Sequence, residues 1–312
     1  MNVIDKFYDL IDECAMLLNE KLRLNYFDSL IRVSSDIING IDVSRLEDED
    51  IVFLEKKYQE INTLTITNEE VRQVMQLLII KAMKHINMNL EIMTPDYINY
   101  IIGYIINSYF KNQKNVSILD VEVGTGNLIT TVSNFIENEA RLIGVENNKL
   151  LVSLCKANCE LQNNDISLYF QDTLTEFTEE VDVAIGDLDC LNNSEKYYPY
   201  EIILNYLPNI DDEGLFIYLI ENDFFNQKQI NDFKKKFKGT FLGLIVLPNE
   251  LFNEKHIGKS ILVGSPKELK NFEMMVMQMS SIKDQDKFYQ NINEIQEWIK
   301  KVKEIEKWKL FQ

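Results

Sequence analysis

Apolar residues recur at helical spacing through the first part of the chain, so residues 1–90 are predicted to be entirely helical. The pattern is clearest in the first segment, at Ile4, Phe7, Leu10, Ile11, Leu17, Leu18 and Leu22. Thr67 to Glu70 has the sequence of a capping box and opens a long helix that runs to about Ile86. This part contains no glycine-rich or catalytic pattern, and we expect a module for recognition or for homodimer formation.

Beyond residue 90, helical patterns alternate with short apolar runs. Thr94 and Pro95 are typical of a helix start, and this helix runs to about Phe110. The predicted strands are Ser117–Val123, Leu142–Glu146, Ile166–Phe170, Val181–Asp187, Leu215–Ile220, Phe241–Leu247 and Ser260–Gly264. The last run follows a loop that is too short for a crossover helix, so it should return antiparallel to its predecessor. The pattern predicts an α/β fold with a doubly wound, Rossmann-like sheet of seven strands.

Three regions follow from this pattern. A helical domain spans residues 1–90, an α/β domain spans residues 91–267, and a C-terminal extension spans residues 268–312. The extension carries an amphipathic helix over residues 283–309, whose apolar stripe suits packing on its own chain better than a dimer seam.

The stretch from Ile118 to Asn127 is the strongest functional signal in the chain. An apolar run ends in Asp120 and turns through Gly124-Thr125-Gly126 before a helix begins near Asn127. Glycines let the backbone approach a ligand closely, and the helix start presents unpaired N–H groups. Glu146 ends the next apolar run, 20 residues after Gly126, followed by Asn147. This is where nucleotide-binding folds place the acid that holds ribose hydroxyls.

Two ligand classes use this arrangement. Dinucleotide sites require a third glycine, and Ile129 stands at that position. S-adenosylmethionine (SAM) has no phosphate groups and needs only a small-residue turn with an acid at the end of each of the first two strands. The residues therefore favour SAM, while another nucleotide or a nucleotide-free domain stays open as an alternative.

Candidate chemistry follows the third and fourth strands. Asp172 is placed to accept from an adenine amine, although a polar strand end would look the same. Methyltransferases that act on an exocyclic amine use an Asn or Asp side chain and a backbone carbonyl to hold it, with an aromatic ring stacked on the base. Of these features only Asp187 is present, and Leu188 directly after it is a candidate substrate-binding residue. Tyr197 and Tyr198 could supply the ring, and core packing is the other interpretation of this pair.

Charge and cysteine content restrict the partners and the compartment. The net charge is −18, of which −12 falls within residues 91–267, and this acidity argues against duplex DNA as a ligand. His85 and His256 lack partners at metal-ligand spacing, so no metal site is expected. The cysteines (Cys14, Cys155, Cys159 and Cys190) form no disulfide framework. With no membrane-length apolar run and no signal-peptide pattern, we expect a cytoplasmic protein that does not enter membranes.

These motifs together resemble one known family. The helical N-terminal part, Thr94-Pro95, Asp120-x-x-x-Gly124-Thr125-Gly126-Asn127, Asp187 and Leu247-Pro248 with Leu251-Phe252 are similar to N6-adenine-specific DNA methyltransferases, in particular the YtxK-type relatives of Gram-positive bacteria. The resemblance covers roughly residues 1–267 and implies a class I SAM-dependent methyltransferase domain.

The resemblance also implies a role for each matching residue. Thr94 would lie near the SAM carboxylate and Asp120 near its amino group, above a floor made by Gly124 and Gly126. Glu146 would hold the ribose, Asp172 the adenine, and Asp187 would occupy the catalytic Asn/Asp position.

The chain departs from the family pattern at two places in this site. Glu122 replaces a small residue beside the cofactor, where it would either block the pocket or contact the SAM ammonium. The family's (Asn/Asp)-Pro-Pro-aromatic motif is Asp187-Leu188-Asp189-Cys190 here. Two hypotheses remain: a SAM-dependent methyltransferase that acts on an amine, and a catalytically decayed methyltransferase fold that serves as a SAM-binding or protein-interaction module.

Overall fold

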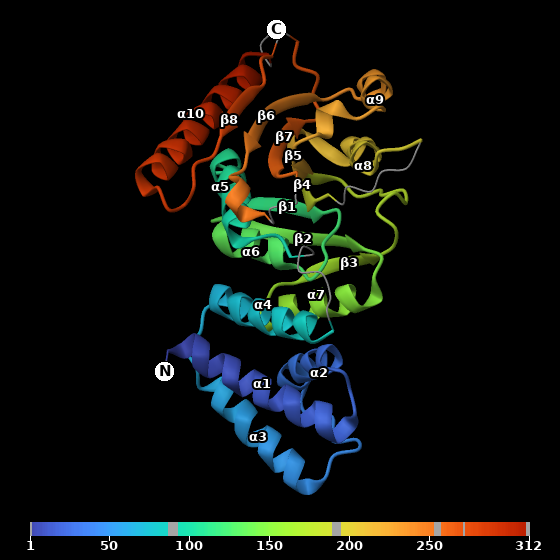
Figure 1. Ribbon diagram of the computed structural model, residues 1–312, viewed down its shortest axis with the longest axis vertical. Coiled ribbons are helices and arrows are strands. Elements are labelled where there is room, and N and C mark those ends of the chain that lie inside the picture. The colour runs from blue at the N-terminus through green and yellow to red at the C-terminus, as the bar shows by residue number, and fades with distance from the viewer. Residues whose placement is uncertain (1, 87–92, 189–194, 253–256, 271, 310–312) are drawn as a thin grey trace.

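A helical domain lies at one end of the molecule and a large sheet at the other (Figure 1). The computed structural model describes residues 2–86, 93–188, 195–252, 257–270 and 272–309. The helical domain consists of α1 (Val3–Leu22), α2 (Tyr26–Asn39), α3 (Asp48–Asn62) and α4 (Asn68–His85). The predicted capping box opens α4: the Thr67 Oγ1 accepts from the Glu70 N–H at 3.3 Å, and the Glu70 carboxylate accepts from the Thr67 N–H at 2.8 Å.

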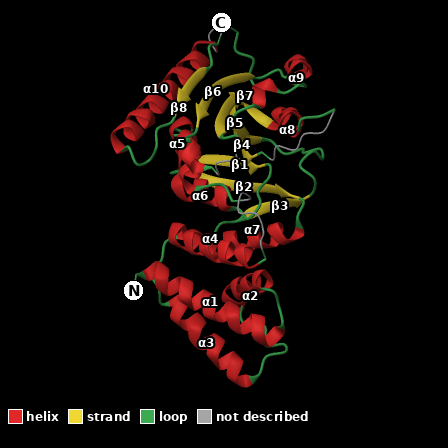
Figure 2. Cartoon of the chain, viewed as in Figure 1, coloured by secondary structure: helices red, strands yellow, loops and turns green. Residues whose placement is uncertain are grey.

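The sheet confirms the predicted α/β class (Figure 2). Its strands are β1 (Asn115–Asp120), β2 (Glu139–Glu146), β3 (Ile166–Phe170), β4 (Val181–Asp187), β5 (Ile210–Glu221), β6 (Thr240–Val246), β7 (Lys259–Ser265) and β8 (Met275–Gln278). In the described part of the chain the strand order is β3-β2-β1-β4-β5-β7-β6-β8. The strands from β3 to β5 are parallel, and β7 lies antiparallel between β5 and β6.

Two details differ from the predicted strands. β1 ends at Asp120 and not at Val123, so Asp120 lies at the carboxyl end of a strand. β8 is an additional strand, parallel to β6, and it comes from the region that was predicted as an extension outside the sheet. The sheet therefore has eight described strands and not the predicted seven.

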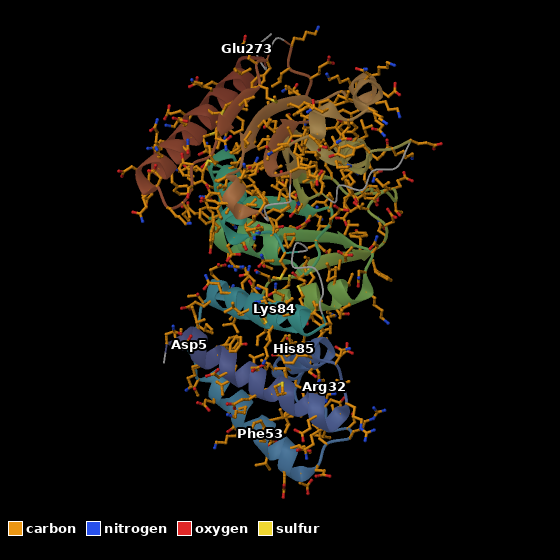
Figure 3. All side chains as sticks on the ribbon, viewed as in Figure 1. Asp5, Arg32, Phe53, Lys84, His85 and Glu273 are labelled. Carbon is orange, nitrogen blue, oxygen red and sulfur yellow. The ribbon has the colours of Figure 1, made fainter. Side chains whose placement is uncertain are left out.

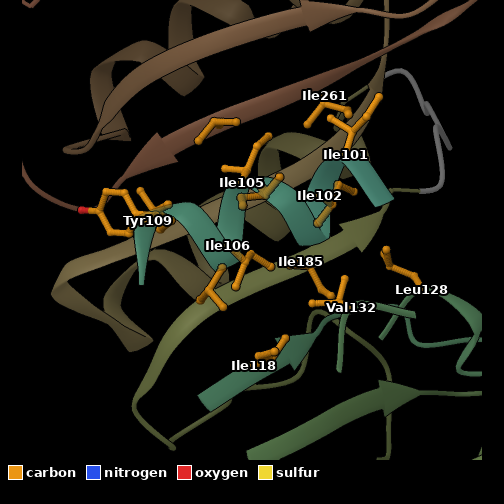
Figure 4. Packing of buried hydrophobic residues seen from close by; sticks show 14 of the residues in the cluster. Ile101, Ile102, Ile105, Ile106, Tyr109, Ile118, Leu128, Val132, Ile185 and Ile261 are labelled. Atoms are coloured by element: carbon orange, nitrogen blue, oxygen red, sulfur yellow. The ribbon is translucent and has the colours of Figure 1, made fainter. Parts of the chain in front are cut away.

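Helices cover both faces of the sheet, which explains why its central strands are continuously apolar. One face packs against α5 (Asp96–Tyr109), α6 (Asn127–Phe135) and α10 (Gln285–Lys309), and Figure 4 shows the isoleucines of α5 on this side. The other face packs against α8 (Tyr198–Tyr206) and α9 (Ile230–Lys236). Ile118 and Leu119, neighbours on β1, accordingly belong to the cores on opposite faces.

The helix α7 (Lys149–Leu161) joins the helical domain to the sheet. Its Leu151 and Leu154 belong to the core of α1–α4, whereas its Cys155 and Cys159 face the core of the sheet. Since one helix contributes to both cores, the helical domain is packed onto the sheet domain and not attached by a linker alone.

The helical domain also carries a groove of about 800 Å³ between α1 and α4. Asp5 of α1 and Lys84 and His85 of α4 are among its lining residues, and Figure 3 labels these three side chains.

No helix among the described residues is long and apolar enough to cross a membrane.

Candidate functional site

The turn after β1 places two glycines in the left-handed region of backbone conformation. Gly124 has a φ of 55° and Gly126 a φ of 79°, values that other residues rarely adopt. Gly126 is also the N-cap of α6, and a Cβ atom there would lie 2.8 Å from the Sγ of Cys155. Glycine is therefore required at position 126 both by the turn and by the close approach of α7.

Asp120 is the acid at the end of β1, and only 1% of its side chain is exposed. Its Oδ1 accepts from the backbone N–H of Glu122 at 3.2 Å. The pKa of Asp120 is raised to about 8, mainly because the group is buried. The hydrogen bond from the Glu122 N–H lowers the pKa, and the charges of Asp187 and Glu146 raise it. A cation beside Asp120 would stabilise its charged form.

Glu146, at the end of β2, is connected to the glycine turn. Its Oε2 accepts from the Gly124 N–H at 3.1 Å, and its Oε1 accepts from the Asn148 N–H at 2.7 Å. Each carboxylate oxygen can accept a second hydrogen bond, so the two hydroxyl groups of a diol could donate to Glu146. Asn147 follows Glu146 and is exposed.

Asp187, at the end of β4, is held from two sides. Its Oδ2 accepts from the Thr94 hydroxyl at 3.1 Å, and its Oδ1 lies 2.5 Å from the Nζ of Lys259. Thr94 precedes α5 and Lys259 begins β7, so three elements meet at this carboxylate. Lys259 was not predicted as a site residue, because its only local signal is a basic side chain directly before the last predicted strand.

The predicted substrate residues divide into two groups. Tyr198 is near the predicted adenine-side acid, because its hydroxyl donates to the Asp172 Oδ1 at 3.3 Å. Tyr197 is 1% exposed and Leu188 is fully buried, and both side chains belong to the core under α8. Tyr197 therefore follows the core-packing interpretation and not the prediction that its ring faces a substrate: it contacts the rings of Tyr200 and Phe224. The assignment of Leu188 to the substrate site stays a prediction. Asp189 and Cys190 lie outside the described residues.

Thr125 and Asn127, the remaining residues of the turn, are buried. The Asn127 amide Nδ2 donates to the Thr94 carbonyl at 3.0 Å, and its Oδ1 accepts from Arg72 of α4 at 2.6 Å. Arg72 is a second contact residue that was not predicted from the sequence. Glu122 is half-buried. Burial raises the pKa of Tyr206 in α8 to about 12, and the charge of Glu122 acts in the same direction.

The chemistry of these residues fits SAM. Asp120, Glu122, Glu146, Asp172 and Asp187 bring carboxylates to the carboxyl edge of the sheet, and SAM carries a sulfonium and an ammonium group. The turn supplies backbone N–H groups and no bulky side chain, but no lysine or arginine for phosphates. No cluster of three or more His, Cys, Asp or Glu side chains suited to a metal occurs among the residues that the structure describes.

Comparisons with known proteins agree with this geometry. Residues 5–83 match the YtxK N-terminal helical domain, and residues 49–198 match the N-6 DNA Methylase family. The chain is 29% identical over 256 residues to the uncharacterised protein YtxK of Bacillus subtilis. The aligned region covers 81% of this chain and 74% of that protein.

Two solved structures have the same architecture over nearly the whole chain. A protein of Listeria monocytogenes, described as a candidate class I SAM-dependent methyltransferase, has a TM-score of 0.83 and 26% identity, over 95% of this chain and 99% of that one. The methyltransferase subunit of a type I restriction-modification system from Streptococcus thermophilus shares the fold, with a TM-score of 0.56 and 11% identity over 95% and 93% of the two chains. The family resemblance seen in the sequence is thus confirmed: residues 5–83 are similar to the YtxK N-terminal helical domain, residues 49–198 are similar to the N-6 DNA Methylase family, and the fold is similar to that of the Listeria class I SAM-dependent methyltransferase structure.

Proposed function

We propose that the protein binds SAM at the carboxyl edge of β1 and β2 and transfers its methyl group to an amine. The observation that carries this proposal is the connection between Glu146 and the glycine turn, 3.1 Å from Oε2 to the Gly124 nitrogen, with Asp120 at the end of β1. Glu146 holds the ribose hydroxyls, Asp120 and Thr94 face the amino-acid end of SAM, and Asp172 with Tyr198 lies at the adenine.

Asp187 is the residue that orients the acceptor amine. SAM supplies an electrophilic methyl group, so the chain needs to position a nitrogen in line with it more than it needs a strong base. Thr94 and Lys259 hold the Asp187 carboxylate in one orientation. A carboxylate is a hydrogen-bond acceptor to which an amine N–H can donate.

Calorimetric titration with SAM and with its demethylated product tests the binding step. We expect micromolar affinity, abolished by Gly126→Arg, whose side chain would collide with Cys155. Gly40→Arg is the matched control, because Gly40 has a φ of 91° with nothing within 4 Å of its Cβ position. It introduces the same residue at a similarly strained backbone, away from the site. Absence of binding at millimolar SAM would contradict the proposal.

A second candidate function is a decayed methyltransferase fold that binds SAM or a protein partner without catalysis. The ion pair between Lys259 and Asp187 favours it, because an amine already occupies one oxygen of the proposed acceptor-binding carboxylate. The domain's acidity also favours it, since it disfavours a DNA substrate.

Transfer of a labelled methyl group to fractionated cell components separates the two functions. An enzyme should show turnover that falls by about 100-fold or more in Asp187→Ala while SAM affinity changes little. A decayed fold should bind SAM and transfer no label. Turnover that is unchanged in Asp187→Ala would remove the role that we assign to this residue.

A further inference from the structure

Arg72 is a fully buried arginine in the helical domain, with 0% of its side chain exposed. Its Nη1 and Nη2 donate to the two carboxylate oxygens of Asp96 at 3.1 and 2.9 Å. Nε and Nη2 also donate to Glu69, one turn earlier on α4, at 2.9 and 2.7 Å. A buried guanidinium requires such charge-assisted contacts, and two carboxylates already satisfy its charge.

One contact of Arg72 goes beyond these ion pairs. Its Nη1 donates to the Oδ1 of Asn127 at 2.6 Å, across 55 residues of sequence. Asn127 follows Gly126 directly and is the first residue of α6, and its Nδ2 donates to the Thr94 carbonyl at 3.0 Å. The Asn127 amide is thereby held at both ends, and with it the end of the glycine turn.

We propose that Arg72 is a positioning residue for the cofactor site, through which the helical domain completes the glycine turn. The inference rests on the function proposed above. Arg72 lies on α4, which packs against α6, and the hydrogen bonds from Arg72 run through Asn127 and Thr94 to Asp187. The turn contains two glycines with positive φ, and glycine has the largest conformational freedom to lose. If the turn is ordered before SAM binds, the entropy cost of ordering it does not reduce the binding free energy. The affinity for SAM is therefore higher.

The geometry also explains why arginine is needed at this position. A guanidinium can reach Asp96, Glu69 and Asn127 at once with its fixed fork of donors, whereas a lysine has a single ammonium. The helical domain is therefore expected to be part of the binding machinery, and a truncated chain without α4 would lack the donor to Asn127.

The test compares Arg72→Met and Arg72→Lys with Arg32→Met. Arg32 is the matched control, because it is a partly buried arginine of α2 that pairs with Asp36 and Asp42 inside the helical domain. In SAM titrations we expect Arg72→Met to raise the Kd about tenfold, which corresponds to roughly 1.4 kcal/mol, and Arg72→Lys to lie between it and the wild type. Arg32→Met should lower the melting temperature and leave the Kd within about twofold.

Amide hydrogen exchange of the SAM-free protein is the second measurement. Arg72→Met should accelerate exchange at residues 121–130, and Arg32→Met should not. Asn127→Ser removes the acceptor of Arg72 but leaves Glu69 and Asp96 in place, so it tests the same contact if Arg72→Met fails to fold. We expect Asn127→Ser to accelerate exchange in the same segment.

Exchange at the wild-type rate at residues 121–130 in Arg72→Met and Asn127→Ser would overturn the inference. It would also be overturned if Arg72→Met raised the Kd no more than Arg32→Met does at a similar loss of stability. If the wild-type protein bound no SAM, the proposed function would fail, while the exchange comparison would still decide whether Arg72 orders the turn.

Discussion

Asp120 is a buried carboxyl group with two other carboxylates near it, and this position makes stability depend on pH. Its pKa rises from the ordinary 3.8 to about 8 in the folded protein. Between these values the folded chain retains a proton that the unfolded chain releases. The contribution of protonated Asp120 to the free energy of unfolding is therefore fully present below about pH 4. It is lost as pH rises to about 8, by up to roughly 1.4 kcal/mol per pH unit.

Asp120→Asn should remove this dependence, because an amide carries no charge at any pH. In urea unfolding between about pH 5 and about pH 9, we expect the variant to gain stability relative to wild type as pH rises, with no further gain above about pH 8. Parallel pH profiles for the two proteins would show that Asp120 ionises normally.

The same residue links SAM affinity to pH. A cationic ligand beside Asp120 stabilises the carboxylate, so binding below pH 8 should release a proton from this group. We expect affinity to increase from pH 6 to about pH 8 and calorimetric heats to depend on the ionisation enthalpy of the buffer. Asp120→Asn should bind more weakly, with both dependences reduced. Equal proton release in the variant would assign it to another group.

At the level of residues, local signals could be recognised from the sequence and distant contacts could not. Asp120, Gly124 and Gly126 lie within one strand and turn, where spacing alone determines their relation. Lys259 reaches Asp187 across 72 residues and Arg72 reaches Asn127 across 55. Such contacts depend on how strands and helices pack. Neither residue carries a motif that would indicate its partner.

At the level of elements, β8 differs most from the sequence expectation. β8 has only four residues, Met275–Gln278, with alternating exposure, so its pattern is too short to distinguish from a loop. The central strands were predictable because both of their faces are covered. The predicted amphipathic helix was found over residues 285–309, and its Ile295, Trp298 and Val302 are buried in the sheet core.

This packing makes α10 an important contributor to stability. Trp298 is 9% exposed and lies over Gly243 of β6, where an added Cβ would come within 2.8 Å of the indole. Trp298→Ala should lower the free energy of unfolding by about 3–5 kcal/mol, because it leaves a cavity between helix and sheet. Urea unfolding followed by far-UV circular dichroism measures this. Tyr289→Ala, on the same helix but 65% exposed, should change it by less than about 0.5 kcal/mol.

At the level of the whole molecule, α7 determines whether the two parts unfold together. Leu151 and Leu154 contribute to the helical core, Cys155 and Cys159 to the sheet core, and Arg72 adds a polar connection. The connections through α7 and through Arg72 converge near the glycine turn, because Cys155 would meet a Cβ added at Gly126 and Arg72 donates to Asn127. The arrangement gives the helical domain a structural role at the site, which periodicity alone could not reveal.

Cooperative unfolding is the consequence that can be measured. Trp298 of α10 lies in the sheet core, so its fluorescence reports on the sheet end, whereas hydrogen exchange can follow α1 to α4. We expect one transition with coincident midpoints in wild type. Leu154→Ala, at a fully buried position, should lower both midpoints together by an amount equivalent to about 2–5 kcal/mol. If Leu154→Ala released the helical domain while the fluorescence midpoint stayed constant, α7 would be only a contact surface, and the helical domain could not order the glycine turn through a shared core.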